Sequence, residues 1–205
     1  MKTESPSFSP VFLGSVLPIV LVGGRSRRFG RDKLREPWGE CGRILVQQPI
    51  DALRAVFGRR VMLMGECDPS IFPFADGMLT DSYPGIGPIG GILSALMQHP
   101  GSICVLAGDM PFFGKSELSR VLLAAQQNPD ALAIIASTDR LHPCAGVYTR
   151  HARQCFESSV SRGNYRLLSA LDPARIITVP VPPEAAVNVN TAGDVRPADS
   201  PRCSK

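Results

Sequence analysis

Short apolar runs alternate with amphipathic segments along most of this chain. The run Val16–Val22 is apolar, rich in β-branched residues and closed by two glycines, which predicts a buried strand. Ser102–Ala107 is a second continuous apolar run of strand length, whereas Ser116–Gln127 has the apolar spacing of an amphipathic helix. Further strands are expected at 60–64, 77–80, 131–136, 144–148, 175–179 and 186–190, and further helices at 44–57, 89–97, 149–158 and 165–171.

Two prolines lie inside predicted elements. Proline has no N–H to donate to a sheet, so Pro18 is tolerable only near the start of its strand. Pro49 should kink the helix expected at 44–57 or delay its start.

This alternation of strands and helices predicts an α/β fold with a mainly parallel sheet that helices cover on both faces. A length of 205 residues suits one domain, which we place at 16–196, after an N-terminal extension at 1–15. The tail at 197–205 is expected to be disordered. Ligands of such sheets bind beyond the carboxyl ends of the strands, so chemically distinctive residues should gather there.

The charge of the chain is concentrated in one short segment. The chain has 22 Lys and Arg against 18 Asp and Glu, and the segment at 25–33 accounts for the whole excess of four. Its charged residues are Arg25, Arg27, Arg28, Arg31, Asp32 and Lys33. A compact cationic loop suits a small polyanion such as a triphosphate. Nucleic-acid binding is not expected, because it more often spreads cations along a face with interleaved aromatic residues.

The six cysteines show neither a CxxC pair nor a Cys/His pattern with zinc spacing. The N-terminus lacks the features of an export signal, and the apolar run Val11–Val22 is too short to span a bilayer. We therefore expect reduced thiols in a cytoplasmic protein that is not bound to a membrane.

Three predicted strands end in segments that could carry chemistry. The first is followed by a loop with glycines and cations, LVGGRSRRFGRDK at 21–33, whose backbone amides can approach phosphate oxygens. Its spacing is neither that of a P-loop nor that of a dinucleotide-binding fingerprint. A second glycine-rich loop starts at Asp81, and Asp109 follows the strand at 102–107 as a hard oxygen ligand suited to Mg²⁺. These residue types fit nucleotidyl transfer, in which an acceptor attacks the α-phosphorus and pyrophosphate leaves.

Five segments in the same order resemble the molybdenum cofactor guanylyltransferase family, whose members are called MobA-like. LVGGRSRRFGRDK resembles the signature LAGGxSxRMGxDK of that family. The other four are DSYPGIGPIGGILSAL at 81–96, VLAGDMPFF at 105–113, HPCAGVY at 142–148 and NVNTAGDV at 188–195. The resemblance implies a Rossmann-like three-layer α/β/α nucleotidyltransferase fold. It also implies transfer of GMP from Mg-GTP to molybdopterin-bound molybdenum, with Mg²⁺ as the cofactor. Other cofactor-handling proteins are expected to deliver the unstable pterin, although no residue shows where they bind.

The resemblance also implies roles for individual residues. Lys33, Arg28 and Asp109 form the catalytic set, with Asp109 as the Mg²⁺ ligand. The residues expected to bind the nucleotide are Leu21, Val22, Gly23, Gly24, Lys33, Asp81, Gly87 and Asp109. Gly91 matches a further motif position, and Asn188 and Asn190 are similar to asparagines on the molybdopterin side. Val22 stands where the family has alanine, which would add bulk beside the base.

Several alternatives remain open at this stage. The related cytidylyltransferases read AAG and RGMxxSL where this chain reads VGG and GPIGG, which favours guanine. A cytidylyltransferase, a sugar-phosphate or cobinamide-phosphate nucleotidyltransferase, or a nucleotide-binding protein without turnover would share the fold. A dinucleotide oxidoreductase is disfavoured, because no acidic residue follows the glycine loop at the expected distance of ~20 residues beyond a second strand. His142 is interpreted as a structural residue at the start of a strand. Aromatic packing is the preferred interpretation of Trp38, Tyr83 and Tyr165 over stacking on a ligand.

Overall fold

The computed structural model of the chain describes residues 8–23, 32–39, 42–58 and 60–190. The middle of the cationic loop, with Gly24 and Arg28, lies outside the described residues. So do residues 1–7 of the predicted N-terminal extension and the whole of the predicted C-terminal tail. Lys33, Asp81, Asp109 and the two asparagines are described.

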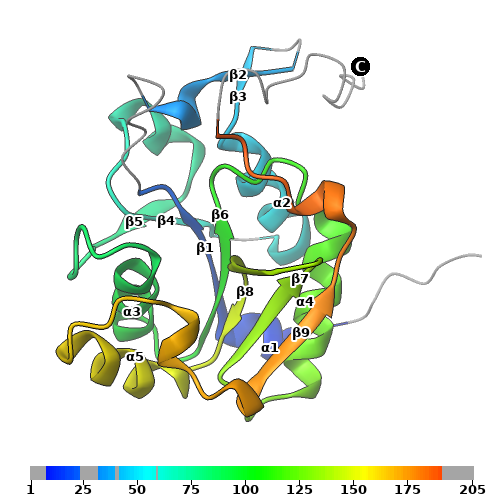
Figure 1. Cartoon of the computed structure of the whole chain (residues 1–205). Helices are drawn as coiled ribbons and strands as arrows, with labels where there is room; N and C mark the ends of the chain where they lie inside the picture. The colour runs from blue at the N-terminus through cyan, green and yellow to red at the C-terminus, as the bar shows by residue number, and fades with distance from the viewer. Residues whose placement is uncertain (1–7, 24–31, 40–41, 59, 191–205) are drawn as a thin grey trace, which may run out of the picture.

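A seven-stranded sheet with the order β5-β4-β1-β6-β8-β7-β9 forms the centre of the molecule (Figure 1). Its strands are β1 (Val16–Leu21), β4 (Met62–Met64), β5 (Gly77–Leu79), β6 (Ser102–Ala107), β7 (Ala133–Ser137), β8 (Leu141–Tyr148) and β9 (Ile176–Pro180). All neighbouring pairs are parallel except the two that involve β8. The prediction of a mainly parallel sheet is therefore confirmed.

Helices cover both faces of the sheet, which confirms the three-layer α/β/α architecture. Helices α2 (Gln47–Phe57) and α4 (Lys115–Gln127) pack on one face, and α3 (Pro88–Gln98) and α5 (Ala152–Ser161) pack on the other. Helix α1 (Pro10–Ser15) directly precedes β1 and was not predicted.

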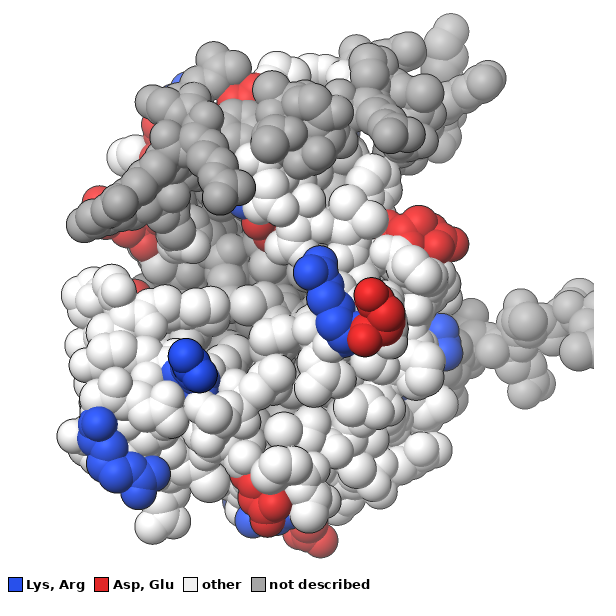
Figure 2. Space-filling model, in the orientation of Figure 1, with Lys and Arg blue, Asp and Glu red and all other residues white. Residues whose placement is uncertain are grey.

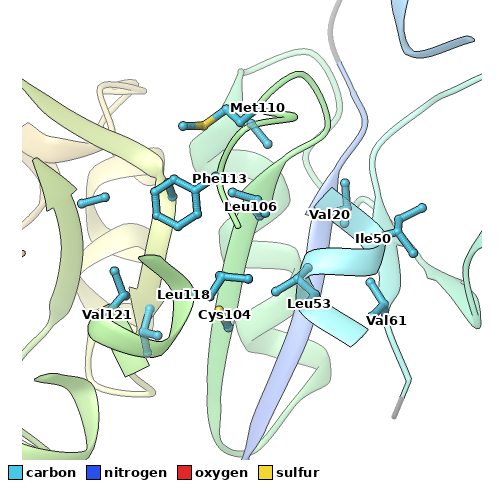
Figure 3. Close-up of a cluster of buried hydrophobic side chains, with 14 of the residues drawn as sticks. Val20, Ile50, Leu53, Val61, Cys104, Leu106, Met110, Phe113, Leu118 and Val121 are labelled. Carbon is cyan, nitrogen blue, oxygen red and sulfur yellow. The ribbon is translucent and has the colours of Figure 1, made fainter. Parts of the chain in front are cut away.

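Side chains of the central strands alternate between the two helical layers. Val20 and Leu106 belong to the core under α2 and α4, whereas Ile19 and Val105 belong to the core under α3 and α5. Figure 3 shows the first of these cores, in which strands β1 and β6 face the two helices. The continuous apolar runs in the sequence follow from this arrangement, because a strand covered on both faces needs apolar residues at successive positions.

The two prolines occupy positions that cost no hydrogen bond in a helix or sheet. Val22 N donates to Met64 O of β4. Alternate residues of a parallel strand form their hydrogen bonds with the same neighbouring strand, so the backbone of Pro18 also faces β4. Pairing with β4 starts only at Ile19, beyond the proline. Pro49 is the third residue of α2, within the first turn, where N–H groups have no partner inside the helix. Of the two outcomes predicted for Pro49, the delayed helix start is the one observed.

Some predicted elements differ from the structure. The helix expected at 165–171 is only a 3₁₀ turn, η3 (Leu168–Ala170), because Leu167 and Leu171 already reach the core from a single turn. The strand expected at 186–190 does not form, because Val189 N donates to Asp109 O instead of to a neighbouring strand. Residues 43–44 belong to a small hairpin of β2 (Pro37–Trp38) and β3 (Arg43–Ile44). The remaining 3₁₀ turns are η1 (Lys33–Arg35), η2 (Pro69–Phe74), η4 (Pro173–Arg175) and η5 (Pro183–Ala186).

Candidate active site

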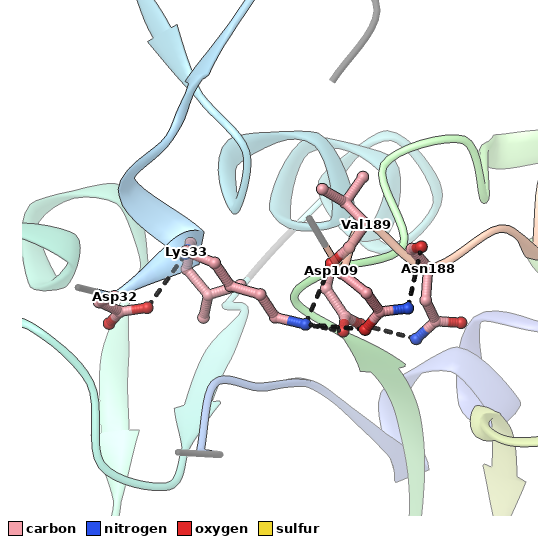
Figure 4. Close-up of polar contacts among 7 residues, drawn as sticks. Asp32, Lys33, Asp109, Asn188 and Val189 are labelled. Atoms are coloured by element: carbon pink, nitrogen blue, oxygen red, sulfur yellow. Dashed lines mark hydrogen bonds and ion pairs between the residues drawn. The ribbon is translucent and has the colours of Figure 1, made fainter. Parts of the chain in front are cut away.

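Lys33 and Asp109 form an ion pair at the carboxyl edge of the sheet. Lys33 is the first residue of η1, and Asp109 lies two residues beyond the end of β6. The lysine Nζ lies 2.5 Å from Asp109 Oδ2, and their side chains are only 19% and 16% exposed. The structure thus brings together the lysine predicted to bind phosphate and the aspartate predicted to bind the metal, two of the three residues expected to be catalytic (Figure 4).

The segment 188–190 completes this cluster. Lys33 Nζ donates to Val189 O at 3.1 Å and to Asn190 Oδ1 at 3.5 Å. Asn188 Nδ2 donates to Asp109 Oδ1 at 3.0 Å. Both asparagine side chains therefore face the ion pair, although the strand from which a common face was predicted is absent.

Asp32 fixes the turn from which Lys33 projects. Its Oδ1 accepts a hydrogen bond from Leu34 N at 3.0 Å and caps η1, and its Oδ2 accepts one from Asp68 N at 3.1 Å. The Asp68 carboxylate also pairs with Arg35 at 2.6 Å. These contacts tie the end of the cationic loop to the loop that follows β4.

Two glycines allow the β1 and β4 loops to touch. Gly65 has a φ of +109°, and a Cβ on it would lie 2.6 Å from Gly23 N and 2.8 Å from Gly23 Cα. A Cβ atom essentially never comes this close to a non-bonded atom, so a side chain at position 65 would displace Gly23. The entrance to the cationic loop is positioned by this backbone contact.

The residues predicted to line the nucleotide differ in what they expose. Gly23 is exposed and Leu21 is half-buried, so both present atoms at the edge of the sheet. Val22 is only 4% exposed, and its side chain packs in the core under α2 and α4. The expectation that this valine adds bulk beside the base is therefore wrong for its side chain, because only its main chain could reach a ligand.

Asp81 makes its described hydrogen bonds within its own loop and α3. Its Oδ1 accepts from Tyr83 N at 2.9 Å and from the buried Ser94 hydroxyl at 3.2 Å. Gly87 precedes α3 with a φ of +84° and is exposed, whereas Gly91 packs against Met64. The structure therefore shows a turn-forming role for Asp81, and its contact with guanosine stays a prediction.

Two residues of β8 lie near this edge. Burial, followed by the negative charge of Asp109, raises the pKa of Cys144 to about 11, so the thiol is protonated beside the carboxylate. His142 is buried, and its Nε2 lies 2.9 Å from the Thr138 hydroxyl. Burial, together with the nearby Arg140, lowers its pKa from the ordinary 6.5. A neutral, hydrogen-bonded histidine at the start of a strand agrees with the structural interpretation.

The aromatic residues considered for stacking behave differently from one another. Trp38 is 2% exposed and meets Phe112 edge-on, with 5.3 Å between ring centroids, which confirms aromatic packing for it. Tyr83 packs partly against the core under α3 and α5. Tyr165 is 48% exposed.

The donor set suits a metal that is shared with a ligand. Within the described residues, no three His, Cys, Asp or Glu side chains come together as a metal site. Asp109 is a single carboxylate with one oxygen paired to the Lys33 ammonium, and Mg²⁺ commonly binds one or two carboxylates together with substrate phosphates and water. The site therefore fits Mg²⁺ that arrives with a triphosphate.

One face of the molecule carries dispersed charge. On the face shown in Figure 2, the described Lys and Arg residues lie scattered among uncharged side chains. Among the described residues, no helix has the length and apolar character that crossing a bilayer requires.

Sequence reasoning did not assign several of these contacts. Asp32 stands two residues before Leu34, the spacing of an aspartate that caps a turn, and could have been found on that basis. The carbonyl of Val189 and the contact of Gly65 with Gly23 involve backbone atoms of residues far apart in the chain, and such contacts leave no side-chain signal. Cys144 was expected only as one of six reduced thiols, and the order of the strands in the sheet places it near Asp109.

A mainly parallel sheet with helices on both faces, and with a lysine–carboxylate pair and glycine-rich loops beyond the carboxyl ends of its strands, defines an α/β protein whose candidate ligand site lies at that edge. The sequence model described as the MobA-like NTP transferase domain matches residues 18–175, and the chain belongs to this family.

Individual relatives agree with this assignment. Proteins named "probable molybdenum cofactor guanylyltransferase" from Chloroflexus aggregans and Aquifex aeolicus are 31% and 28% identical to this chain. The alignments cover 87% of this chain and 90% of the first relative, and 86% of this chain and 87% of the second. The crystal structure of molybdopterin-guanine dinucleotide biosynthesis protein A from Archaeoglobus fulgidus is similar at a TM-score of 0.67. It is 25% identical, and the match covers 88% of this chain and 94% of that chain.

Proposed function

We propose that this protein transfers GMP from Mg-GTP to the phosphate of molybdenum-molybdopterin, with release of pyrophosphate. The observation that carries the proposal is the Lys33–Asp109 pair at the carboxyl edge of the sheet. It is supported by the family membership and by relatives named as molybdenum cofactor guanylyltransferases.

In this proposal Lys33 leaves Asp109 when the nucleotide binds. Its Nζ moves to the phosphates that become pyrophosphate and offsets the charge that develops there. The free protein keeps this cation close to its working position, because Val189 O and Asn190 hold it at the edge of the sheet.

Asp109 would then hold Mg²⁺ through the oxygen that Lys33 leaves, and the metal would supply neutralisation of the charge on the triphosphate. Gly23 and the cationic loop would bind the phosphates, and Arg28 and Gly24 keep the roles that the family resemblance implies. The chain supplies charge and alignment for the attacking phosphate, and no covalent intermediate on the protein is needed.

Guanine is the proposed base and the pterin is the proposed acceptor. The GPIGG segment that opens α3 and the VGG at the end of β1 are the sequence features that favour guanine over cytosine. Asn188 and Asn190 border the edge where the acceptor would approach. We further propose a cytoplasmic location, where other cofactor-handling proteins would supply the pterin.

Pyrophosphate release tests this function. The parent protein is incubated with Mg²⁺, GTP and molybdenum-molybdopterin, alongside Asp109→Asn and the surface control Asp130→Asn. We expect release from the parent and the control and its loss in Asp109→Asn. If the parent releases no pyrophosphate and Asp109→Asn behaves identically, catalysis is excluded and a nucleotide-binding protein without turnover becomes the better account.

A further inference from the structure

The two carboxylate oxygens of Asp109 have different partners. Oδ2 meets the Lys33 ammonium at 2.5 Å, and Oδ1 accepts a hydrogen bond from the Asn188 amide at 3.0 Å. The first partner is a charged group on a long, flexible side chain. The second is a neutral amide on a short side chain, so it costs little to hold in place.

Asn188 is fixed relative to Asp109 by more than its own amide. The next residue, Val189, is fully buried and donates its N–H to Asp109 O at 2.9 Å. Asn190 Nδ2 donates to Asn188 O at 3.3 Å. Residues 188–189 therefore hydrogen-bond to both the main chain and the side chain of Asp109. A carboxylate with one oxygen in such a hydrogen bond cannot rotate freely.

These partners respond differently to a triphosphate. Lys33 is drawn to the phosphates and uncovers Oδ2, whereas the neutral amide has no such reason to leave Oδ1. We infer that Asn188 is a positioning residue that holds Oδ1 of Asp109 and thereby presents Oδ2 to the metal. This inference rests on the proposed function. It differs from the pterin-side role that the family resemblance implies for Asn188, because the amide nitrogen is directed at Asp109 (Figure 4).

Metal-dependent nucleotide affinity separates these roles without any turnover. The Kd of GTP is measured by titration calorimetry in excess Mg²⁺ and in EDTA, with no acceptor present. We expect Asn188→Ala and the similarly sized Asn188→Leu to raise the Kd in Mg²⁺ by about 10–100-fold, the usual effect of removing a partner that orients a metal ligand. The Kd in EDTA should stay that of the parent.

The control is Asn128→Ala, which removes a comparable amide hydrogen bond, 2.8 Å long, to Ala124 O in α4. It should leave both Kd values unchanged. Thermal unfolding of all variants shows whether each is folded, and Asn188→Leu covers the case in which Asn188→Ala leaves a destabilising gap.

Three results would overturn the inference. An unchanged Kd for Mg-GTP together with a raised KM for the acceptor would place Asn188 on the pterin side. An equal rise of the Kd in Mg²⁺ and in EDTA would indicate a general structural role. A parent protein that binds GTP no more tightly in Mg²⁺ than in EDTA would instead refute the metal role of Asp109 in the proposed function, and the inference with it.

Discussion

The contact between Gly65 and Gly23 predicts that Gly65→Ala damages both stability and nucleotide binding. The new Cβ would lie 2.6 Å from Gly23 N, and relieving it to an ordinary 3.4 Å requires the two loops to separate by about 0.8 Å. The atoms that the new Cβ would meet, Gly23 N and Gly23 Cα, are backbone atoms, so no flexible side chain can move aside to relieve the contact.

The matched control is Gly163→Ala after α5. Gly163 also has a positive φ, +72°, but a Cβ there would meet nothing within 4 Å. Gly163→Ala should lower the free energy of unfolding only by the backbone strain of a positive φ, about 1–2 kcal/mol. Gly65→Ala should cost about 1–3 kcal/mol more, since overpacking adds to the backbone strain.

Urea unfolding measures the stability difference, and steady-state kinetics measures the function. Because a displacement near 1 Å can reduce a rate by about 100-fold, we expect kcat/KM for GTP to fall on the order of 10–100-fold in Gly65→Ala and not in Gly163→Ala. Equal stability of the two variants, or an unchanged kcat/KM in Gly65→Ala, would refute the reasoning.

Four further predictions concern single side chains. Asp32→Ala removes two hydrogen bonds to backbone amides, whereas the control Asp172→Ala removes one. Urea unfolding should therefore show Asp32→Ala to be less stable than Asp172→Ala by about 1 kcal/mol, and only Asp32→Ala should lower the affinity for GTP. Lys33→Met removes a charge-assisted phosphate contact of about 1.5–3 kcal/mol, so the calorimetric Kd of GTP should rise about 10–100-fold; an unchanged Kd would exclude the phosphate role. The lowered pKa of His142 means that the unfolded state takes up a proton more readily, so unfolding free energy should fall as pH drops below 6.5, and His142→Gln should flatten that slope. Burial raises the pKa of Cys104 to about 12, so mass spectrometry should find iodoacetamide on it at pH 8 only after urea is added.

The order of strands and helices could be predicted because each buried element leaves a local pattern. The apolar runs at 16–22 and 102–107 correspond to β1 and β6, the central strands whose side chains pack in both hydrophobic cores. The reversed direction of β8 and its place between β6 and β7 depend on long-range pairing, which short patterns do not encode.

The candidate site was predictable where a charged side chain follows an apolar strand in the sequence. Lys33 and Asp109 were both assigned in this way, and the structure brings them into contact. The environment of Val22 could not be predicted, because a motif position does not show which way a side chain points. Residues 186–190 were expected to form a strand, yet the buried Val189 donates its N–H to the main-chain carbonyl of Asp109.

Competition among nucleotides tests the central claim most directly. The parent protein is given equal amounts of GTP, CTP, ATP and UTP with Mg²⁺ and molybdenum-molybdopterin, and the products are identified by mass spectrometry. The proposed function predicts a product larger than the acceptor by a GMP unit, and its absence in Asp109→Asn. A product that carries CMP instead, or an acceptor that remains unmodified in every mixture, would contradict it.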